Sequence, residues 1–265
     1  MNFFTRFGNR ILAPLVSTAG FGMRIAGETI YRIPQLPKRW VTFREQFYLS
    51  CVRTLHVVVF VAFFIGMIVA LQVGLELARY GQQEAIGYGV SLMMVREMGP
   101  FVTAILMAAS VGSAMAAELG TMKVQEEITA LEVMSVDVIS LLVLPRVLAL
   151  TLAMPILTIL ANYVGTIGGG VIAVTQLNLD FGAYTTNALT SLRDIGDWIP
   201  LPISLFGGLL KSLIFGFVIG VIGCASGLSA SRGAAGVGRT TRAAVRDSII
   251  LVIVLNFFLG KFLFQ

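Results

Sequence analysis

The sequence predicts an all-α protein that crosses a membrane about five times, and two observations point to this class. Hydrophobic residues make up 57% of the chain and charged residues only 12%, whereas an average soluble domain has roughly 25% charged residues. The apolar residues also gather in long runs, and about 20 of them in a row can span a bilayer as a helix. We therefore expect this chain to fold in a bilayer.

Five segments are long and apolar enough to be spans. The first contains the unbroken core VVVFVAFFIGMIVAL, and the second reads MGPFVTAILMAASVGSAMAA. The third and fourth are long enough to tilt, and the fifth, SIILVIVLNFFLGKFLF, is short. The predicted bounds are Leu55–Gly74, Met98–Ala117, Val147–Thr175, Ile203–Ser226 and a last span from Ser248.

Lysine and arginine residues are distributed unevenly between the links. Eight of the 19 precede Thr54, and four arginines lie between spans four and five. The links after spans one and three offer only Arg79 and Arg193 as clear loop cations. Because positive links stay in the cytosol, the N-terminus is predicted to be cytosolic and the C-terminus to lie outside. The net charge of +5 suits anionic headgroups and does not indicate nucleic-acid binding.

Two flanking segments have the spacing of amphipathic helices. The first lies in the basic region of residues 1–53, as expected of a helix on the cytosolic leaflet, and its apolar stripe consists of Phe4, Phe7, Ile11 and Leu15. The second follows Asp180 on the predicted outer side, and its stripe consists of Phe181, Tyr184, Ala188 and Leu192. We interpret both as connectors, with a specific binding role as the alternative.

The link between spans two and three, KVQEEITALEVMSVDV, is the only acidic segment on the predicted cytosolic side. On a helical wheel, its apolar residues share one side with Glu127 at the edge, namely Val124, Ile128, Leu131, Met134 and Val138. A helix lying on an anionic leaflet would normally be basic. The segment is therefore either a solvated turn or a docking helix for a cytosolic partner.

Three charged residues lie at or near membrane depth, where charge is costly and usually functional. Arg96 and Glu97 come just before span two, beside Gly99 and Pro100, and could pair, face a polar cavity or sit at headgroup level. Lys211 lies about eight residues, or roughly 12 Å, into span four. That depth favours a cavity-facing lysine over one that reaches outward to the headgroups.

Small residues recur every four positions along span two. Such ridges let helices approach closely, and packing within one subunit is favoured over a subunit interface. The residues of this ridge are Ala104, Ala108, Gly112 and Ala116.

The motifs of catalysis are absent from the sequence. There is no G-x-x-x-x-G-K-[ST], and GAAGVGRT lacks the lysine and the preceding strand of a phosphate loop. One histidine and two cysteines offer neither a nucleophile–base pair nor a metal site. We therefore expect no enzymatic activity, cofactor or metal in this chain, and any ATPase that drives it would be another polypeptide.

The region Arg96–Ala149 resembles the signature region of the MlaE family, the permease subunits of MCE-associated lipid ABC transporters. The strongest pieces are REMGP, GSAMAAELGTM, EEITALEVM-VD and PR, which lie in about a fifth of the chain. The resemblance implies a single permease domain over residues 1–265, with an N-terminal region 1–53, a transmembrane region 54–265 and a coupling helix near residues 123–136.

The resemblance implies a homodimer in the bacterial inner membrane that moves phospholipids between that membrane and the outer envelope. Cytosolic ATPase subunits would hold Mg-ATP below it, together with a small ATPase-associated regulator, and a hexamer of MCE-domain proteins would stand above it. The acidic helix would be the coupling helix, through Glu126, Glu127, Ile128, Leu131, Glu132 and Met134. The lipid cavity would be lined by Val69, Leu77, Tyr80, Arg96, Glu97, Met98 and Lys211.

One departure and one alternative stand beside this interpretation. Family members commonly have Gly-Arg where this chain has Ala109-Ser110, so a role of that arginine cannot be carried over. The alternative function, from another class, is a secondary carrier or channel that conducts a small polar solute past Arg96, Glu97 and Lys211.

Overall fold

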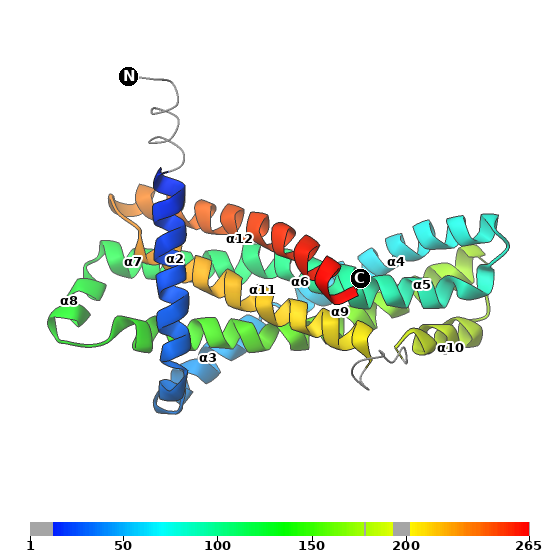
Figure 1. Cartoon of the computed structure of the whole chain (residues 1–265), viewed down its shortest axis with the longest axis horizontal. Helices are drawn as coiled ribbons and strands as arrows, with labels where there is room; N and C mark the ends of the chain where they lie inside the picture. Colours follow the sequence, from blue (N-terminus) through cyan, green and yellow to red (C-terminus); the bar gives the residue numbers. More distant parts are fainter. Residues whose placement is uncertain (1–12, 178, 193–201, 265) are drawn as a thin grey trace, which may run out of the picture.

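A computed structural model describes residues 13–177, 179–192 and 202–264, and within these ranges it contains helices and no strand. Five helical stretches are long and apolar enough to cross a membrane, which confirms the predicted fold class. They run along the long axis of the molecule (Figure 1). Their bounds are Ile33–Arg79, Gln83–Val124, Ile139–Leu177, Ser204–Leu228 and Gly233–Phe264.

The N-terminal part consists of helix α2 (Ala13–Tyr31), a 3₁₀ segment η2 (Ile33–Arg39) and helix α3 (Trp40–Cys51), which leads into α4 (Leu55–Arg79). Helix α2 lies across the long helices near the end of the molecule that carries α8 (Figure 1). The predicted interfacial helix lies mainly before α2 and stays a prediction. The first part of that helix's stripe, Phe4, Phe7 and Ile11, lies outside the described residues.

The second helical stretch is longer than predicted and is not regular. It runs through η3 (Gln83–Ala85), α5 (Ile86–Met93), η4 (Met94–Met98), α6 (Gly99–Met107), η5 (Ala108–Gly112) and α7 (Ser113–Val124). Both η4 and η5 are π-helical turns, and each inserts an extra residue into the helix. Such turns occur frequently at functional sites, and here one of them carries Arg96 and Glu97.

The remaining elements are α8 (Glu127–Val133), a third π-helical turn η6 (Ile139–Val143), α9 (Leu144–Leu177), α10 (Phe181–Ser191), α11 (Ile203–Leu228) and α12 (Gly233–Phe264). Helix α10 begins at Asp180, whose carboxylate accepts a hydrogen bond from the backbone N–H of Ala183 at 3.0 Å. Tyr184 and Ala188 of its stripe are buried, and α10 packs on α5 and α9. The middle of this stripe therefore faces protein, whereas Phe181 at its start is exposed.

Glycines bring α4 and α9 into direct backbone contact. A Cβ atom at Gly66 would overlap the carbonyl oxygen of Gly165, and one at Gly168 would overlap the carbonyl oxygen of Phe63. Small residues are the usual means by which membrane helices approach closely. Helix α9 also packs against α11 and α6, and it has the largest buried share of the five spans.

Candidate functional site: a polar cluster, an apolar cluster and an acidic helix

The small-residue ridge lies inside the subunit. Ala104, Ala108, Gly112 and Ala116 are all buried, and a Cβ atom at Gly223 of α11 would come within 3.0 Å of the carbonyl oxygen of Gly112. A repeat of four drifts around a helix of 3.6 residues per turn. The extra residue in the π-helical turn η5 offsets that drift, so the ridge keeps facing its neighbours.

Lys211 is enclosed by its own chain. Its side chain is 0% exposed, and its ammonium lies 2.6 Å from Oε1 of Glu97, whose side chain is 35% exposed. The second oxygen of Glu97 accepts a hydrogen bond from the side-chain amide of Asn256 at 2.9 Å. One carboxylate thus joins η4, α11 and α12, and the ammonium is surrounded by protein groups.

Pro100 explains why a backbone carbonyl group near Lys211 is available as a second hydrogen-bond acceptor. Proline has no N–H group, so the turn before it keeps a carbonyl without its usual helical donor. Lys211 donates to the carbonyl oxygen of Arg96 at 3.2 Å. In a membrane such a carbonyl has no water to bind, and a neighbouring side chain satisfies it.

Arg96 lies on the same turn but is less enclosed. Its Nε donates to Oγ of Ser204 at 2.9 Å, and its guanidinium carbon lies 5.0 Å from the ring centroid of Phe264. The ammonium of Lys211 lies 4.9 Å from the same ring. The structure therefore brings the three predicted charges together and adds Asn256, Ser204 and Phe264. We call these six residues the polar cluster.

The predicted apolar wall forms a second group. Val69 belongs to a buried cluster with Val90, Met94 and Tyr184, and Leu77 and Met98 pack against it. Tyr80, by contrast, is largely exposed at the end of α4. Three of the four apolar or aromatic residues assigned to the lipid cavity thus share one cluster, and Tyr80 lies apart from it.

A cavity of about 560 Å³ lies elsewhere, between α3, α4 and the second helical stretch. Its wall includes Ala109 and Ser110. These are the two residues at the position where the sequence departs from the expected Gly-Arg. Arg53 and Glu118 contribute charges to the same wall. The small side chains of the η5 turn therefore help to leave this space open.

The acidic link contains a shorter helix than predicted. Helix α7 ends at Val124, Glu126 adopts a left-handed backbone with φ 62°, and α8 covers only Glu127–Val133. Ile128 and Val138 are buried, as the wheel predicts, and Leu131 is partly buried. Met134 is exposed instead, beside Val133, which is 81% exposed.

The face that α8 presents outward therefore combines acidic and apolar residues. Its exposed side chains include Glu126, Glu127, Glu132, Val133 and Met134. In Figure 1 this helix projects from one end of the bundle. A short helix with carboxylates around two apolar side chains can meet a groove with basic edges.

Sequence reasoning missed the polar residues that complete the buried sites. Asn256 and Ser204 lie within apolar runs and had no motif to mark them. Asn162 of α9 is a further example, because neither atom of its buried side-chain amide has a hydrogen-bond partner among the described residues. A polar residue within an apolar run is itself the signal that could have found all three.

The five spans and the charges enclosed between them define a polytopic α-helical membrane protein. Residues 43–262 match the family described as "Permease MlaE". The chain belongs to this family.

Similar proteins extend over most of the sequence. A probable ABC transporter permease protein of Synechocystis sp. is 39% identical over 83% of this chain and 81% of its own. The chloroplastic protein TRIGALACTOSYLDIACYLGLYCEROL 1 of Arabidopsis thaliana is 33% identical over 91% of this chain and 67% of its own. The intermembrane phospholipid transport system permease protein MlaE of Haemophilus influenzae is 28% identical over 100% of this chain and 98% of its own.

Proposed function

We propose that this chain is the membrane-spanning subunit of an ATP-driven phospholipid transporter in the bacterial inner membrane. The observation that carries the proposal is the family match over residues 43–262, supported by the full-length similarity to a phospholipid transport permease. ATP with its Mg²⁺ would be hydrolysed by separate cytosolic ATPase subunits. The chain itself would act as a homodimer without enzymatic activity.

The surface of α8 supports the ATPase partner. Its exposed carboxylates surround Val133 and Met134, which gives the partner an apolar anchor with charges at its rim. Rim charges steer association, and apolar anchors supply much of the binding energy. The α8 end would accordingly face the cytosol. An MCE-domain hexamer would cover the opposite end, and a small regulator would bind the ATPase.

The residues around η4 support a lipid substrate rather than a small solute. A phospholipid needs an apolar wall for its chains and a donor for its phosphate. Val69, Leu77 and Met98 share the apolar cluster, and the partly exposed Arg96 presents a guanidinium of the kind that binds phosphate with several donors. Lys211 would act from within, by holding Glu97 and the backbone of Arg96 in place.

The proposal is tested by purifying the chain in detergent and identifying the proteins and lipids that accompany it by mass spectrometry. We expect an ABC ATPase and bound phospholipid, and ATP-dependent lipid transfer when the complex is reconstituted in vesicles. A small-solute carrier would instead move solute and carry no stoichiometric lipid, and that result would overturn the proposal.

The proposed orientation has its own test. Single cysteines at the exposed Gln125 and at the partly exposed Asn187 of α10, in a chain lacking Cys51 and Cys224, would lie toward opposite ends of the bundle. An impermeant thiol reagent added outside spheroplasts should label position 187 and spare position 125. Labelling of position 125 alone would reverse the orientation and remove α8 from the cytosol.

A further inference from the structure

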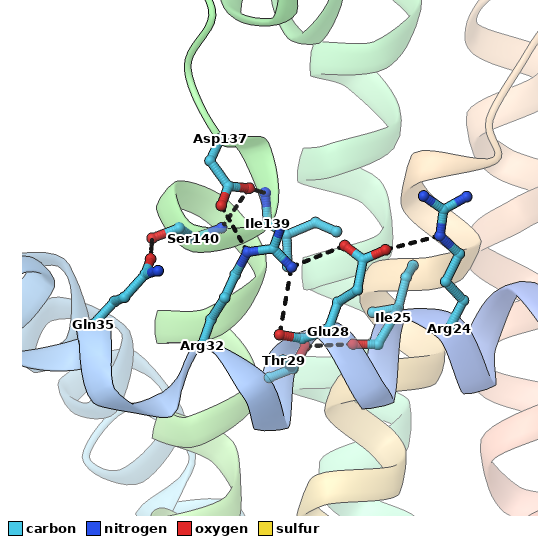
Figure 2. A network of polar contacts seen from close by, with 9 residues as sticks. All are labelled: Arg24, Ile25, Glu28, Thr29, Arg32, Gln35, Asp137, Ile139 and Ser140. Atoms are coloured by element: carbon cyan, nitrogen blue, oxygen red, sulfur yellow. Dashed lines mark hydrogen bonds and ion pairs between the residues drawn. The ribbon is translucent and has the colours of Figure 1, made fainter.

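The segment that leaves α8 is joined to α2 by a chain of polar contacts, which Figure 2 shows. Asp137 lies at its centre, between the end of α8 and the start of η6. Its Oδ2 accepts a hydrogen bond from Nε of Arg32 at 2.6 Å. Arg32 and Asp137 are separated by 105 residues in sequence, so this ion pair connects two parts of the chain that are distant in sequence.

The same carboxylate also begins the third span. Oδ1 of Asp137 accepts from the backbone N–H groups of Ile139 and Ser140 at 3.1 and 3.3 Å. The first N–H groups of a helix lack partners within the helix, and a side-chain oxygen at this position satisfies them. Asp137 therefore uses one oxygen to hold η6 and the other to hold α2.

The contacts on the α2 side form a continuous row. Nη1 of Arg32 also donates to Oε2 of Glu28 at 2.9 Å, and Nε of Arg24 donates to Oε1 of Glu28 at 2.8 Å. A second link runs parallel to the first, because Oγ of Ser140 donates to Oε1 of Gln35 at 2.8 Å. Two side-chain bridges thus join the α2–η2 region to η6.

Helix α2 is in turn anchored in the membrane-spanning core. Ile25 is buried and belongs to the same hydrophobic cluster as Val143, Val147 and Val221. These residues lie in η6, α9 and α11, and α2 packs directly against α11. A displacement of Asp137 can therefore reach span three through its backbone contacts and span four through α2.

We propose that the Arg32–Asp137 pair makes α2 move together with the acidic helix α8, so that a push on α8 is delivered to spans three and four at once. Arg32 and Asp137 are positioning residues in this proposal, since both lie outside the residues proposed to contact lipid. The proposal rests on the proposed function only in taking the docked ATPase as the protein that displaces α8. The physical connection between α8 and α2 is a property of this chain alone.

The connection is tested first in the isolated permease, with spin labels at Met23 of α2 and Val133 of α8, two exposed positions, and with Cys51 and Cys224 replaced. Pulsed electron paramagnetic resonance should give a narrow distance distribution in the otherwise unchanged chain. Asp137→Asn keeps an oxygen for the N–H groups of η6 but loses the charge that faces Arg32. We expect it to broaden the distribution at least about twofold.

Matched variants distinguish the effect of the Arg32–Asp137 ion pair from the effect of the neighbouring charges. Arg24→Gln removes a charge from the same row without touching Asp137, and should leave the distribution narrow. Arg32→Gln should broaden it as Asp137→Asn does, and the double variant should be no broader than either single one. A distribution that stays narrow in Asp137→Asn would overturn the proposal, whatever partner binds α8.

The second measurement uses the unlabelled transporter in vesicles and counts ATP molecules hydrolysed per lipid moved. A weakened relay should raise this ratio several-fold in Asp137→Asn and Arg32→Gln, with ATPase binding and thermal unfolding unchanged. Equal ratios in the variants and the unaltered protein would overturn the relay. If the unaltered chain binds no ATPase, the proposed function fails, and the spin-label distances still decide whether α8 and α2 are joined.

Discussion

Around η4, Lys211 meets Glu97 with its ammonium fully enclosed, whereas at the α8 end Arg32 meets Asp137 with side chains 21% and 42% exposed. An ammonium that loses its partner inside protein cannot turn to water, so separating the first pair is costly. Exposed pairs contribute little to stability, typically up to about 1 kcal/mol. The enclosed pair is thus suited to holding helices in place. The exposed pair is suited to transmitting a movement, because stretching or breaking it costs little free energy.

The largest effect should come from breaking the enclosed pair. Glu97→Ala leaves the ammonium of Lys211 without its carboxylate and removes the acceptor of Asn256. We expect a loss of about 3 kcal/mol in the free energy of unfolding, since Glu97 is itself partly exposed. Thermal unfolding in detergent measures it. Glu97→Gln with Lys211→Met, which removes both charges, should recover most of the loss, and a double variant as unstable as Glu97→Ala would contradict this account.

The second effect concerns binding at the α8 end. Reversing Glu126 and Glu127 to Lys should weaken the ATPase complex at least about tenfold, or 1.4 kcal/mol, because both carboxylates are exposed on the proposed contact face. Thermal unfolding should not change. Co-purification of the ATPase is the measurement, and Glu84→Lys, an exposed reversal at the other end of the bundle, is the control. Equal ATPase recovery with the unaltered protein, the Glu126 and Glu127 variant and the Glu84 variant would show that α8 does not contact the ATPase.

A smaller effect is expected at Arg96, which unlike Lys211 remains partly exposed. Arg96→Ala should lower co-purified phospholipid and lipid transfer a few-fold, with ATPase binding retained, because the phosphate loses a donor that matches its geometry. Arg96→Lys should recover part of the loss. Leu77→Arg should block the apolar wall, and lipid transfer by Leu77→Arg at the rate of the unaltered protein would show that the path lies elsewhere.

The smallest effect should appear on acidification. The side-chain hydrogen bond from Arg24, with a further contribution from Arg32, lowers the pKa of Glu28 against the opposing effect of burial. A carboxyl group with a lowered pKa stabilises the folded arrangement above its unfolded pKa of about 4.3, and this contribution is lost as pH falls through the lowered value. A spin label at Met23 should therefore gain mobility as the pH falls through the lowered pKa of Glu28. In Glu28→Gln this pH dependence should be reduced, and an equal response in both proteins would exclude Glu28 as its origin.

The sequence was sufficient to place the spans but not their ends. The fourth predicted span, Ile203–Ser226, differs from α11 by two residues at its end. The fifth span was expected from Ser248, yet α12 begins at Gly233 and includes Arg239 and Arg242. An apolar run marks the part of a helix that needs lipid. The helix itself continues into charged sequence wherever its backbone hydrogen bonds continue.

The sequence could predict those site residues whose type is unusual at their position, such as a lysine within an apolar span. It could not predict the parts of the site where the backbone departs from a regular helix. Lys211 was identifiable from its depth alone, but its partner depends on contacts between residues 114 positions apart. The predicted face of the acidic helix was partly wrong because the wheel assumed one helix over residues 123–138. The left-handed backbone at Glu126 and Ser135 limits that helix, which turns Met134 outward.

The contact between Gly66 and Gly165 restricts how the spans can rearrange. Two helices that touch through their backbones cannot slide along one another, because any shift would bring a side chain into a space that admits only hydrogen atoms. We therefore expect little shear between α4 and α9, and expect opening to involve rotation of other helices against this pair. Helix α12 has the smallest buried share of the five spans, but its Asn256 donates to Glu97, so a rotation of α12 would have to break that contact.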